Sequence, residues 1–189
     1  ERDINKAIYY YSLASNQNFP QAQHNLGHIY YSGEYVERDI NKAIYYYSLA
    51  SNQNIPQAQI ILGYIYFSGE YVERNINKAI YYLSLVSNHN FPRAQYILGY
   101  IYFRGEYIKR DINKAIHYYS LASNHNFPLA QYNLGYIYYS GEYVERDINK
   151  AIYYYSLASN QNFPQAQHNL GHIYYSGEYV ERDINKAIY

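Results

Sequence analysis

Hydrophobic residues recur along the chain at the spacing of a helix face, in two kinds of segment that alternate. Residues 20–32 represent the first kind and residues 40–51 the second. In both, small and apolar side chains fall three or four positions apart, which places them on one face of an α-helix. The two stripes consist of Ala22, Leu26, Ile29, Tyr30 and Gly33 in the first segment and of Ile40, Ala43, Ile44, Tyr47, Ala50 and Ser51 in the second. The pattern needs no strand anywhere, and it predicts an all-α fold.

The ends of both helices are marked by residues that start or stop helices. The first begins at Pro20, whose fixed φ suits a first helical turn, and ends at Gly33, which tolerates a left-handed conformation. The second follows Asp39, a good N-cap, and runs to about Ser51. Gly27 lies inside the first helix, which predicts close approach by a neighbouring helix. We name the first an A helix and the second a B helix, and the short loops between them favour antiparallel pairs.

The A–B pair is one unit of an internal repeat with a period of 36 residues. The motif that opens the A helix begins at Pro20, Pro56, Pro92, Pro128 and Pro164. Residues 1–45 are identical to residues 145–189, so the chain, about five and a quarter units, is predicted to be an excerpt of a longer array. A single helix pair cannot bury two apolar stripes, and its units must therefore stack on their neighbours. We expect residues 1–189 to form a single α-solenoid domain.

The repeated residues resemble the Sel-like repeat family, a relative of the tetratricopeptide repeat. The resemblance rests on Ala22, Leu26, Gly27, Tyr30 and Gly33 in the A helix, on Asp39, Lys42, Ala43, Tyr46, Tyr47 and Ala50 in the B helix, and on their equivalents in the other units. The resemblance implies a right-handed superhelix of antiparallel helix pairs. It also implies that the protein acts as an adaptor, which holds partner proteins on the concave side of the superhelix. Some family members are cysteine-rich proteins with reported enzymatic character, a property that is not expected here because cysteine is absent.

Composition and charge exclude several classes of function. The chain carries 15 basic and 15 acidic side chains, and 32 tyrosines but no cysteine, methionine or tryptophan. Without cysteine there is no disulfide framework, no thiolate metal site and no cysteine nucleophile. A net charge of zero argues against a general binder of polyanions. The longest uncharged stretch, residues 43–69, contains Pro56 and several amide side chains, so no membrane span is expected.

The units of the chain can be compared with one another, column by column. Of the 36 columns, 14 vary, and six of these form one face of the A helix, opposite the core stripe. In a solenoid of this kind that face lines the concave groove, and we predict a partner groove for a protein or peptide, rich in tyrosine and arginine, which anchor interfaces. Its predicted residues are Tyr64, Phe67, Arg93, Tyr96, Tyr100, Phe103, Arg104, Tyr132, Tyr136 and Tyr139. The alternative is drift, because columns without packing constraints vary freely.

A second repeated surface lies on the B helix, opposite its core stripe. Leucine and tyrosine occupy places where lysine and glutamate would normally keep a solenoid soluble, and we predict a self-association strip of Tyr45, Leu49, Tyr81, Leu85, Leu121 and Leu157. If the strip is exposed, copies of the chain could assemble side by side into filaments or a coat layer. Alternatively, curvature between units buries the leucines.

Other chemistry is weakly indicated. His24 and His28 have the i, i+4 spacing of two metal ligands, but no third ligand is evident. Carboxylates are copied in most units, whereas a catalytic site needs a unique constellation. The unit from residue 92 is locally basic, which would suit single-stranded nucleic acid, but the other units are neutral or slightly acidic. We therefore predict no catalytic, cofactor or metal site. The favoured function is a non-enzymatic adaptor, and the alternative is a self-assembling structural protein.

Overall fold

The computed structural model describes residues 3–177, and these residues form ten α-helices and no strand. The B helices are α1 (Ile4–Asn16), α3 (Ile40–Asn52), α5 (Ile76–Val86), α7 (Ile112–Asn124) and α9 (Ile148–Ser159). The A helices are α2 (Pro20–Ser32), α4 (Pro56–Ser68), α6 (Pro92–Arg104), α8 (Pro128–Ser140) and α10 (Pro164–Ser176). The all-α fold of paired helices that repeat every 36 residues is thus confirmed.

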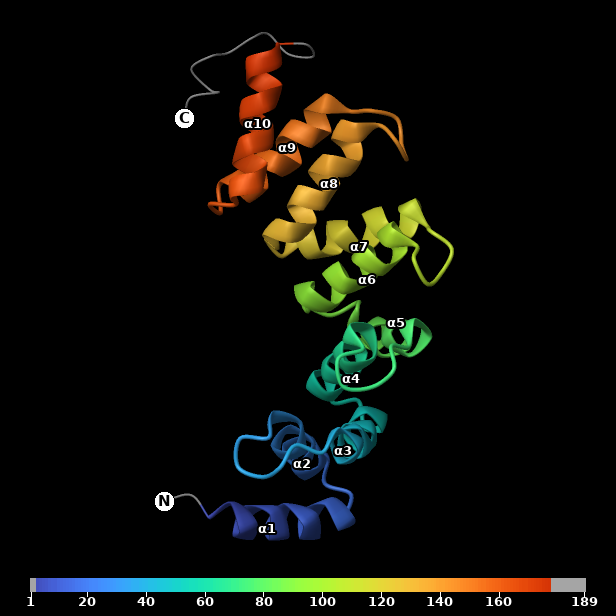
Figure 1. Cartoon of the computed structure of the whole chain (residues 1–189), viewed down its shortest axis with the longest axis vertical. Helices are drawn as coiled ribbons and strands as arrows, with labels where there is room; N and C mark the ends of the chain where they lie inside the picture. Colours follow the sequence, from blue (N-terminus) through green and yellow to red (C-terminus); the bar gives the residue numbers. More distant parts are fainter. Residues whose placement is uncertain (1–2, 178–189) are drawn as a thin grey trace. The chain divides into compact units, whose positions relative to one another are not determined.

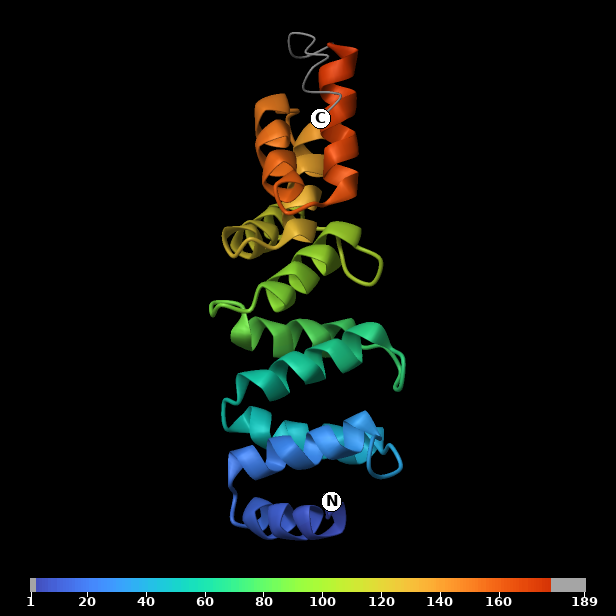
Figure 2. The ribbon, with the colours of Figure 1, turned by 90° about the vertical axis from the view of Figure 1, so that its left-hand side faces the viewer.

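The chain divides into two compact units, residues 1–89 and residues 90–189. Unit 1 holds α1–α5 and unit 2 holds α6–α10, and within each unit successive helices pack side by side (Figures 1 and 2). The most extensive contacts join each A helix to the B helix that follows it, in the pairs α2–α3, α4–α5, α6–α7 and α8–α9. The single continuous array over residues 1–189 stays a prediction.

The turn from an A helix to its B helix is fixed by the residues that the sequence singled out. Gly33 has a φ of 66°, and its N–H donates to the carbonyl of Ile29. Asp39 then caps α3, because its Oδ1 accepts a hydrogen bond of 2.9 Å from the Lys42 N–H. The Asp39 and Lys42 side chains also form an ion pair at 3.3 Å. The same cap recurs before α1, α5, α7 and α9.

The loop from a B helix to the next A helix depends on asparagine. Asn18, Asn54, Asn126 and Asn162 have φ between 55° and 63°, a left-handed conformation that asparagine tolerates well. The equivalent Asn90 does not adopt it, and α5 ends two residues earlier than α3 and α7 do. Val86 is fully buried in α5, where the other B helices carry alanine. The helix ends at this larger side chain, earlier than the predicted serine column.

The core of each pair is built from the predicted stripes. Leu26, Ala43, Tyr47 and Ala50 are fully buried, and so are most of their equivalents. The glycine inside α2, α6 and α8 makes room for a tyrosine ring, and Gly63 of α4 does so for Leu83: a Cβ added to Gly27 would lie 2.7 Å from Cδ1 of Tyr47. The predicted close approach at this column is confirmed.

A column of buried glutamines was not predicted as core. Gln23, Gln59, Gln95 and Gln131 are all at most 4% exposed. Gln59 donates from Nε2 to the carbonyl of Ser51 at 3.2 Å, and Gln131 makes the equivalent bond to Ser123 at 3.3 Å. Gln59 and Gln131 thus satisfy helix-end carbonyls, and they tie α4 to α3 and α8 to α7. The presence of glutamine at this column in all five units was the signal in the sequence.

A ring stack ties the outer edge of each pair together. Tyr30 of α2 lies parallel to Tyr46 of α3, with ring centroids 5.9 Å apart, and the Lys42 ammonium lies 5.0 Å from the Tyr30 centroid. The same arrangement recurs at Tyr66–Tyr82, Tyr102–Tyr118 and Tyr138–Tyr154, with Lys78, Lys114 and Lys150. Cation–π and stacking contacts of this kind add to helix pairing. Much of the tyrosine content therefore serves the fold.

Candidate partner groove

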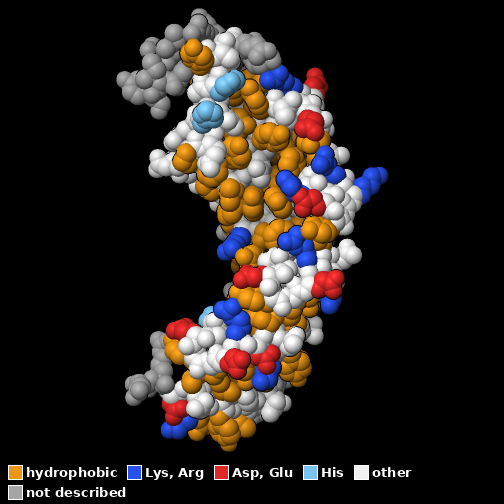
Figure 3. Space-filling model, in the orientation of Figure 1, with side chains coloured by type: hydrophobic (Ala, Val, Ile, Leu, Met, Phe, Trp, Pro, Cys, Tyr) orange, Lys and Arg blue, Asp and Glu red, His pale blue; other side chains and the backbone are white. Residues whose placement is uncertain are grey.

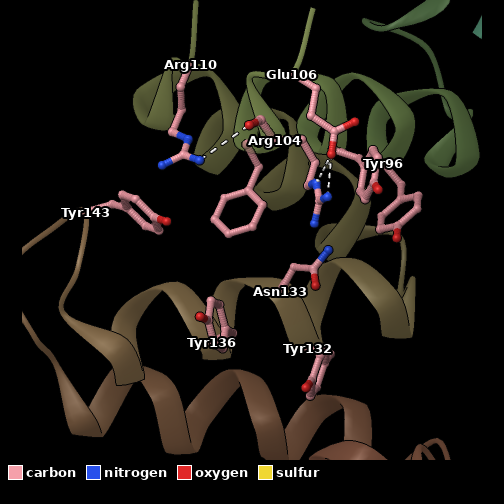
Figure 4. Close-up of a pocket in the computed structure, with 10 residues that line it drawn as sticks. Tyr96, Arg104, Glu106, Arg110, Tyr132, Asn133, Tyr136 and Tyr143 are labelled. Carbon is pink, nitrogen blue, oxygen red and sulfur yellow. Dashed lines mark hydrogen bonds and ion pairs between the residues drawn. The ribbon is translucent and has the colours of Figure 1, made fainter.

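Unit 2 contains a cavity of about 620 Å³ between α6 and α8 and the turns that follow these helices. Six aromatic and four polar side chains line it: Tyr96, Tyr100, Phe103, Tyr132, Tyr136 and Tyr143, with Arg104, Glu106, Arg110 and Asn133. Figure 4 shows these side chains on the two helices and the two turns that border the cavity. We name this cavity the unit 2 groove.

The aromatic part of the groove is held together by edge contacts around Phe103. Its ring lies 6.3 Å from that of Tyr136 and 5.7 Å from that of Tyr143, both at nearly right angles. On the other side, the ring of Tyr96 packs against two further rings. Its centroid lies 5.2 Å from that of Phe127 and 5.8 Å from that of the buried Tyr119. Burial raises the pKa of the Tyr96 hydroxyl, which therefore stays protonated at neutral pH. These rings form a half-buried, pre-formed surface that also offers hydroxyl groups.

The polar part of the groove is built around two guanidinium groups. Arg104 donates from Nε to Oε1 of Glu106 at 2.8 Å and from Nη2 to the same oxygen, an exposed ion pair that raises the pKa of Arg104 (Figure 4). Arg110 donates from Nη2 to the carbonyl of Arg104 at 3.4 Å, and its guanidinium lies 4.8 Å from the centroid of Tyr143. Aromatic rings and acceptors thus hold both cations at the groove.

Arg104 is an arginine found in one unit only, whereas its ion-pair partner Glu106 has a glutamate equivalent in every unit. At the position of Arg104 the other units carry serine, at Ser32, Ser68 and Ser140. There the serine Oγ accepts a hydrogen bond from the backbone N–H of the glutamate that follows, as Ser32 does from Glu34 at 3.4 Å. In the unit that carries Arg104, this contact to the backbone of the glutamate is replaced by an ion pair to the side chain of the equivalent glutamate, Glu106.

The structure brings together six of the ten residues predicted for the partner groove. Tyr96, Tyr100, Phe103, Arg104, Tyr132 and Tyr136 line the unit 2 groove. Arg93 is exposed at the start of α6 and does not line it. Tyr139 does not line the groove either: its ring centroid lies 6.5 Å from that of Tyr155, and the guanidinium of Arg146 lies over its ring. Tyr64 and Phe67 belong to unit 1, where both are half-buried on α4.

Four residues that line the groove were not among the ten predicted ones: Asn133, which lies on the variable face of α8, and three residues on the turns. Glu106, Arg110 and Tyr143 lie on the turns between helices, whereas the comparison of columns pointed to the A-helix face. The columns of these three turn residues do not vary between units, so variation alone could not reveal them. The available signal was the opposite charge of Glu106, two residues after the unusual Arg104.

The predicted self-association strip is exposed at its tyrosines and partly covered at its leucines. Tyr45 and Tyr81 are each 59% exposed, and Leu85 is 42% exposed. The remaining residues of the strip, Leu49, Leu121 and Leu157, are half-buried. In Figure 3, hydrophobic side chains, with tyrosine among them, are spread over the visible face of each unit, and charged side chains are scattered between them.

Of the two histidines that had ligand spacing, His24 packs against an aromatic ring. His24 is partly buried, lies edge-on to Tyr47 with ring centroids 5.6 Å apart, and has a pKa lowered by that burial. Within residues 3–177 no three histidine or carboxylate side chains are close enough to share a metal ion. None of the helices described here has the length and apolar character needed to cross a bilayer.

A second hollow, of about 450 Å³, lies in unit 1 between α1 and α2. It exposes Ala7 and Tyr11 of α1, whose equivalents Ala43 and Tyr47 are fully buried by the A helix of their own pair. In α3, α5, α7 and α9 the equivalent face packs against the A helix that precedes it.

The repeated helix pairs and the lined groove define an α-helical repeat scaffold of the protein-interaction type. Comparison with protein families identifies the repeat: the Sel1 repeat matches residues 1–19, 20–55, 56–89, 92–127, 128–163 and 164–189. The chain belongs to the Sel1 repeat family, whose fold is related to the tetratricopeptide repeat. This family is a scaffold family and is generally non-catalytic. A comparison with curated protein sequences gives no match.

Solved structures show the same fold. A Sel1 repeat protein from Oxalobacter formigenes is 33% identical with a TM-score of 0.77, over 98% of this chain and 76% of that one. A protective antigen of uropathogenic Escherichia coli with an SLR fold is 26% identical with a TM-score of 0.84, over 96% of this chain. This chain spans only 40% of the antigen. Cysteine-rich protein B of Helicobacter pylori is 30% identical with a TM-score of 0.52, over 71% of this chain and 96% of that protein.

Proposed function

We propose that the protein is a non-enzymatic adaptor that binds an extended segment of a partner protein in the unit 2 groove. The observation that carries this proposal is the convergence of variable columns on one cavity. Tyr96, Tyr100 and Arg104 each differ from their equivalents in the unit of residues 20–55, and all three line the groove. Drift would scatter such changes, whereas a binding site would gather them.

The chemistry of the lining supports binding of a peptide. Tyrosine and arginine are enriched among residues that dominate binding energy, and rigid aromatic side chains lose little entropy when they are covered. A pre-formed cavity of about 620 Å³ falls in the range of known ligand pockets. Membership of the Sel1 repeat family, a protein-interaction type of scaffold, agrees with a protein partner.

The test uses substitutions that other units of this chain already tolerate. The combined variant Tyr96→His, Tyr100→His and Arg104→Ser gives α6 the residues that α2 carries at these columns, so the fold should survive. Phage-displayed random peptides selected on the wild-type chain should bind the variant at least about tenfold more weakly, which corresponds to the loss of one good anchor. Circular dichroism should show unchanged helicity. Equal binding to both proteins would reject the groove.

The matched control lies outside the groove, on the same repeat. Leu121→Lys changes a half-buried residue of the B helix that does not line the cavity. The selected peptides should bind this variant as they bind the wild-type chain. If both variants lose binding equally, the loss reflects general damage rather than removal of a site.

A second function, self-assembly, is favoured by the exposed tyrosines of the B helices. Tyr9, Tyr45, Tyr81 and Tyr153 recur at 58–59% exposure, beside leucines that are only partly covered. Such a periodic apolar surface is typical of interfaces between copies. Mass that grows with concentration in light scattering would support this function, and a monomer at every concentration would exclude it.

A further inference from the structure

The positive charge of the chain is concentrated in the repeat that forms one wall of the unit 2 groove. Residues 92–127 contain five basic and two acidic side chains, a net charge of +3, whereas each other complete repeat has a net charge of zero or −1. The excess arises at Arg93, Arg104 and Lys109, which replace glutamine, serine and glutamate of the unit 20–55. A partner that meets this wall is therefore selected for negative charge.

Within the groove, Arg104 already holds a carboxylate, that of Glu106. The contact is local, between residues two positions apart, and it is exposed: the side chains of Arg104 and Glu106 are 52% and 44% accessible. Exposed ion pairs of this kind contribute little to stability, because water and salt screen them. Glu106 can therefore be exchanged for another carboxylate at small cost.

We propose that the segment bound in the unit 2 groove is acidic, and that it places an aspartate or glutamate carboxylate on Arg104 in exchange for Glu106. This inference rests on the proposed function and specifies its ligand. The guanidinium presents a fork of N–H donors that matches a carboxylate in two-point geometry. Arg110 lies at the same groove, held on the ring of Tyr143, and supplies a second cation for a neighbouring acidic residue.

The groove favours a short acidic peptide over a long polyanion such as nucleic acid. The next repeat, residues 128–163, is net negative, and its Glu142 lies beside Tyr143 and raises the pKa of that tyrosine through a hydrogen bond. A continuous phosphate backbone would meet this negative charge within one repeat. A peptide can place its carboxylates on Arg104 and Arg110 and its apolar side chains on the aromatic rings.

The test compares three pools of fluorescein-labelled peptides of about 12 residues in fluorescence anisotropy with the whole chain. The pools share the same tyrosine, leucine and glycine positions and differ only in carrying aspartate and glutamate, asparagine and glutamine, or lysine and arginine. We expect the acidic pool to bind tightest and Arg104→Ser to weaken it about tenfold, the loss of one charged hydrogen-bonded contact. Glu106→Gln should tighten binding several-fold, because it removes the internal competitor.

Opposite effects of the two substitutions separate recognition from structural damage, which would weaken binding in both. The matched control Ser68→Arg, the equivalent position in unit 1, should leave the affinity for the acidic pool unchanged. If the amide pool binds as tightly as the acidic one, the acidic ligand is wrong while the groove function stands. If no pool binds, the groove function itself is rejected. Tighter binding of a thymidine oligonucleotide that also depends on Arg104 would overturn the peptide ligand.

Discussion

Three consecutive tyrosines of the B helix do three different things, because each step along a helix turns the side chain by about 100°. Tyr47 is fully buried beneath Gly27, Tyr46 stacks on Tyr30, and Tyr45 is 59% exposed. The role of a tyrosine in this helix is therefore determined by its position in the repeat rather than by its residue type. At this scale the sequence was informative, since the stripe spacing alone placed Tyr47 in the core.

Gly99 provides a test of the packing at this column. A Cβ there would lie 2.5 Å from Cδ1 of Tyr119, a fully buried ring that has no room to turn away. Alanine gains about 1 kcal/mol in helix propensity, but overpacking costs about 1–3 kcal/mol. We expect Gly99→Ala to lower the free energy of unfolding by about 1 kcal/mol, measured by thermal melting. A higher melting midpoint would show that the ring can yield.

The matched control for that substitution is Asn113→Ala on the exposed face of α7. It brings a smaller gain in helix propensity, about 0.5 kcal/mol, without any close neighbour to displace. We expect its effect to stay within about 0.5 kcal/mol.

The buried hydroxyl of Tyr47 should make the free energy of unfolding depend on pH. Its hydroxyl is buried and makes no hydrogen bond, and burial raises its pKa above the usual value near 10. Above pH 10 the unfolded chain can release this proton and the folded chain cannot, so this tyrosine lowers stability as pH rises. Tyr47→Phe should raise the free energy of unfolding by about 1 kcal/mol at pH 7, since an unpaired hydroxyl is removed.

The same variant should lose less stability than the wild-type chain between pH 9 and 11, as measured by chemical denaturation at each pH. Tyr45→Phe, which changes an exposed ring of the same helix, is the control and should be nearly neutral at pH 7. If the free energy of unfolding of Tyr47→Phe falls with pH as steeply as that of the wild-type chain, the buried hydroxyl is not the cause of the loss.

At the scale of helices and loops, local chemistry determined most of what could be predicted. Pro20, Gly33 and Asp39 gave the boundaries of α2 and α3 to within a residue, because each acts on its own backbone. The early end of α5 was not predictable in this way. Val86 is compatible with a helix, and it is fully buried in a space that Ala50, Ala122 and Ala158 fill in the other B helices. That space is a property of packing between helices, which the local sequence does not express.

This difference between loops can be tested with one substitution at two equivalent sites. Asn126 has a φ of 55°, which costs alanine about 1 kcal/mol more than it costs asparagine or glycine, while Asn90 lacks that conformation. We therefore expect Asn126→Ala to lower the free energy of unfolding by about 1 kcal/mol and Asn90→Ala to leave it within about 0.5 kcal/mol of wild type, as measured by thermal melting. Asn126→Gly should be tolerated. Equal losses at both asparagines would show that φ is not the cause.

At the scale of the whole molecule, the sequence located groove residues on both A helices and missed those on the turns. Internal comparison found the A-helix residues because their columns vary, as at Tyr100 and Arg104. Arg110 and Tyr143 are invariant in their columns, and they line the groove only because the turns after α6 and α8 lie beside these two helices. Arrangement between repeats, rather than residue identity, decides which of these side chains meet.

The two proposed surfaces should be separable, since one lies on A helices and turns and the other on B helices. Replacing Leu49, Leu85 and Leu121 with lysine introduces charge on the self-association strip without touching the groove lining. If the chain self-associates, we expect this variant to stay monomeric in light scattering and to bind groove-selected peptides normally. Arg104→Ser should do the reverse, weakening peptide binding while leaving the mass unchanged. Loss of both properties in either variant would mean that peptide capture depends on assembly, and the chain would then act as an assembled scaffold rather than as a single adaptor.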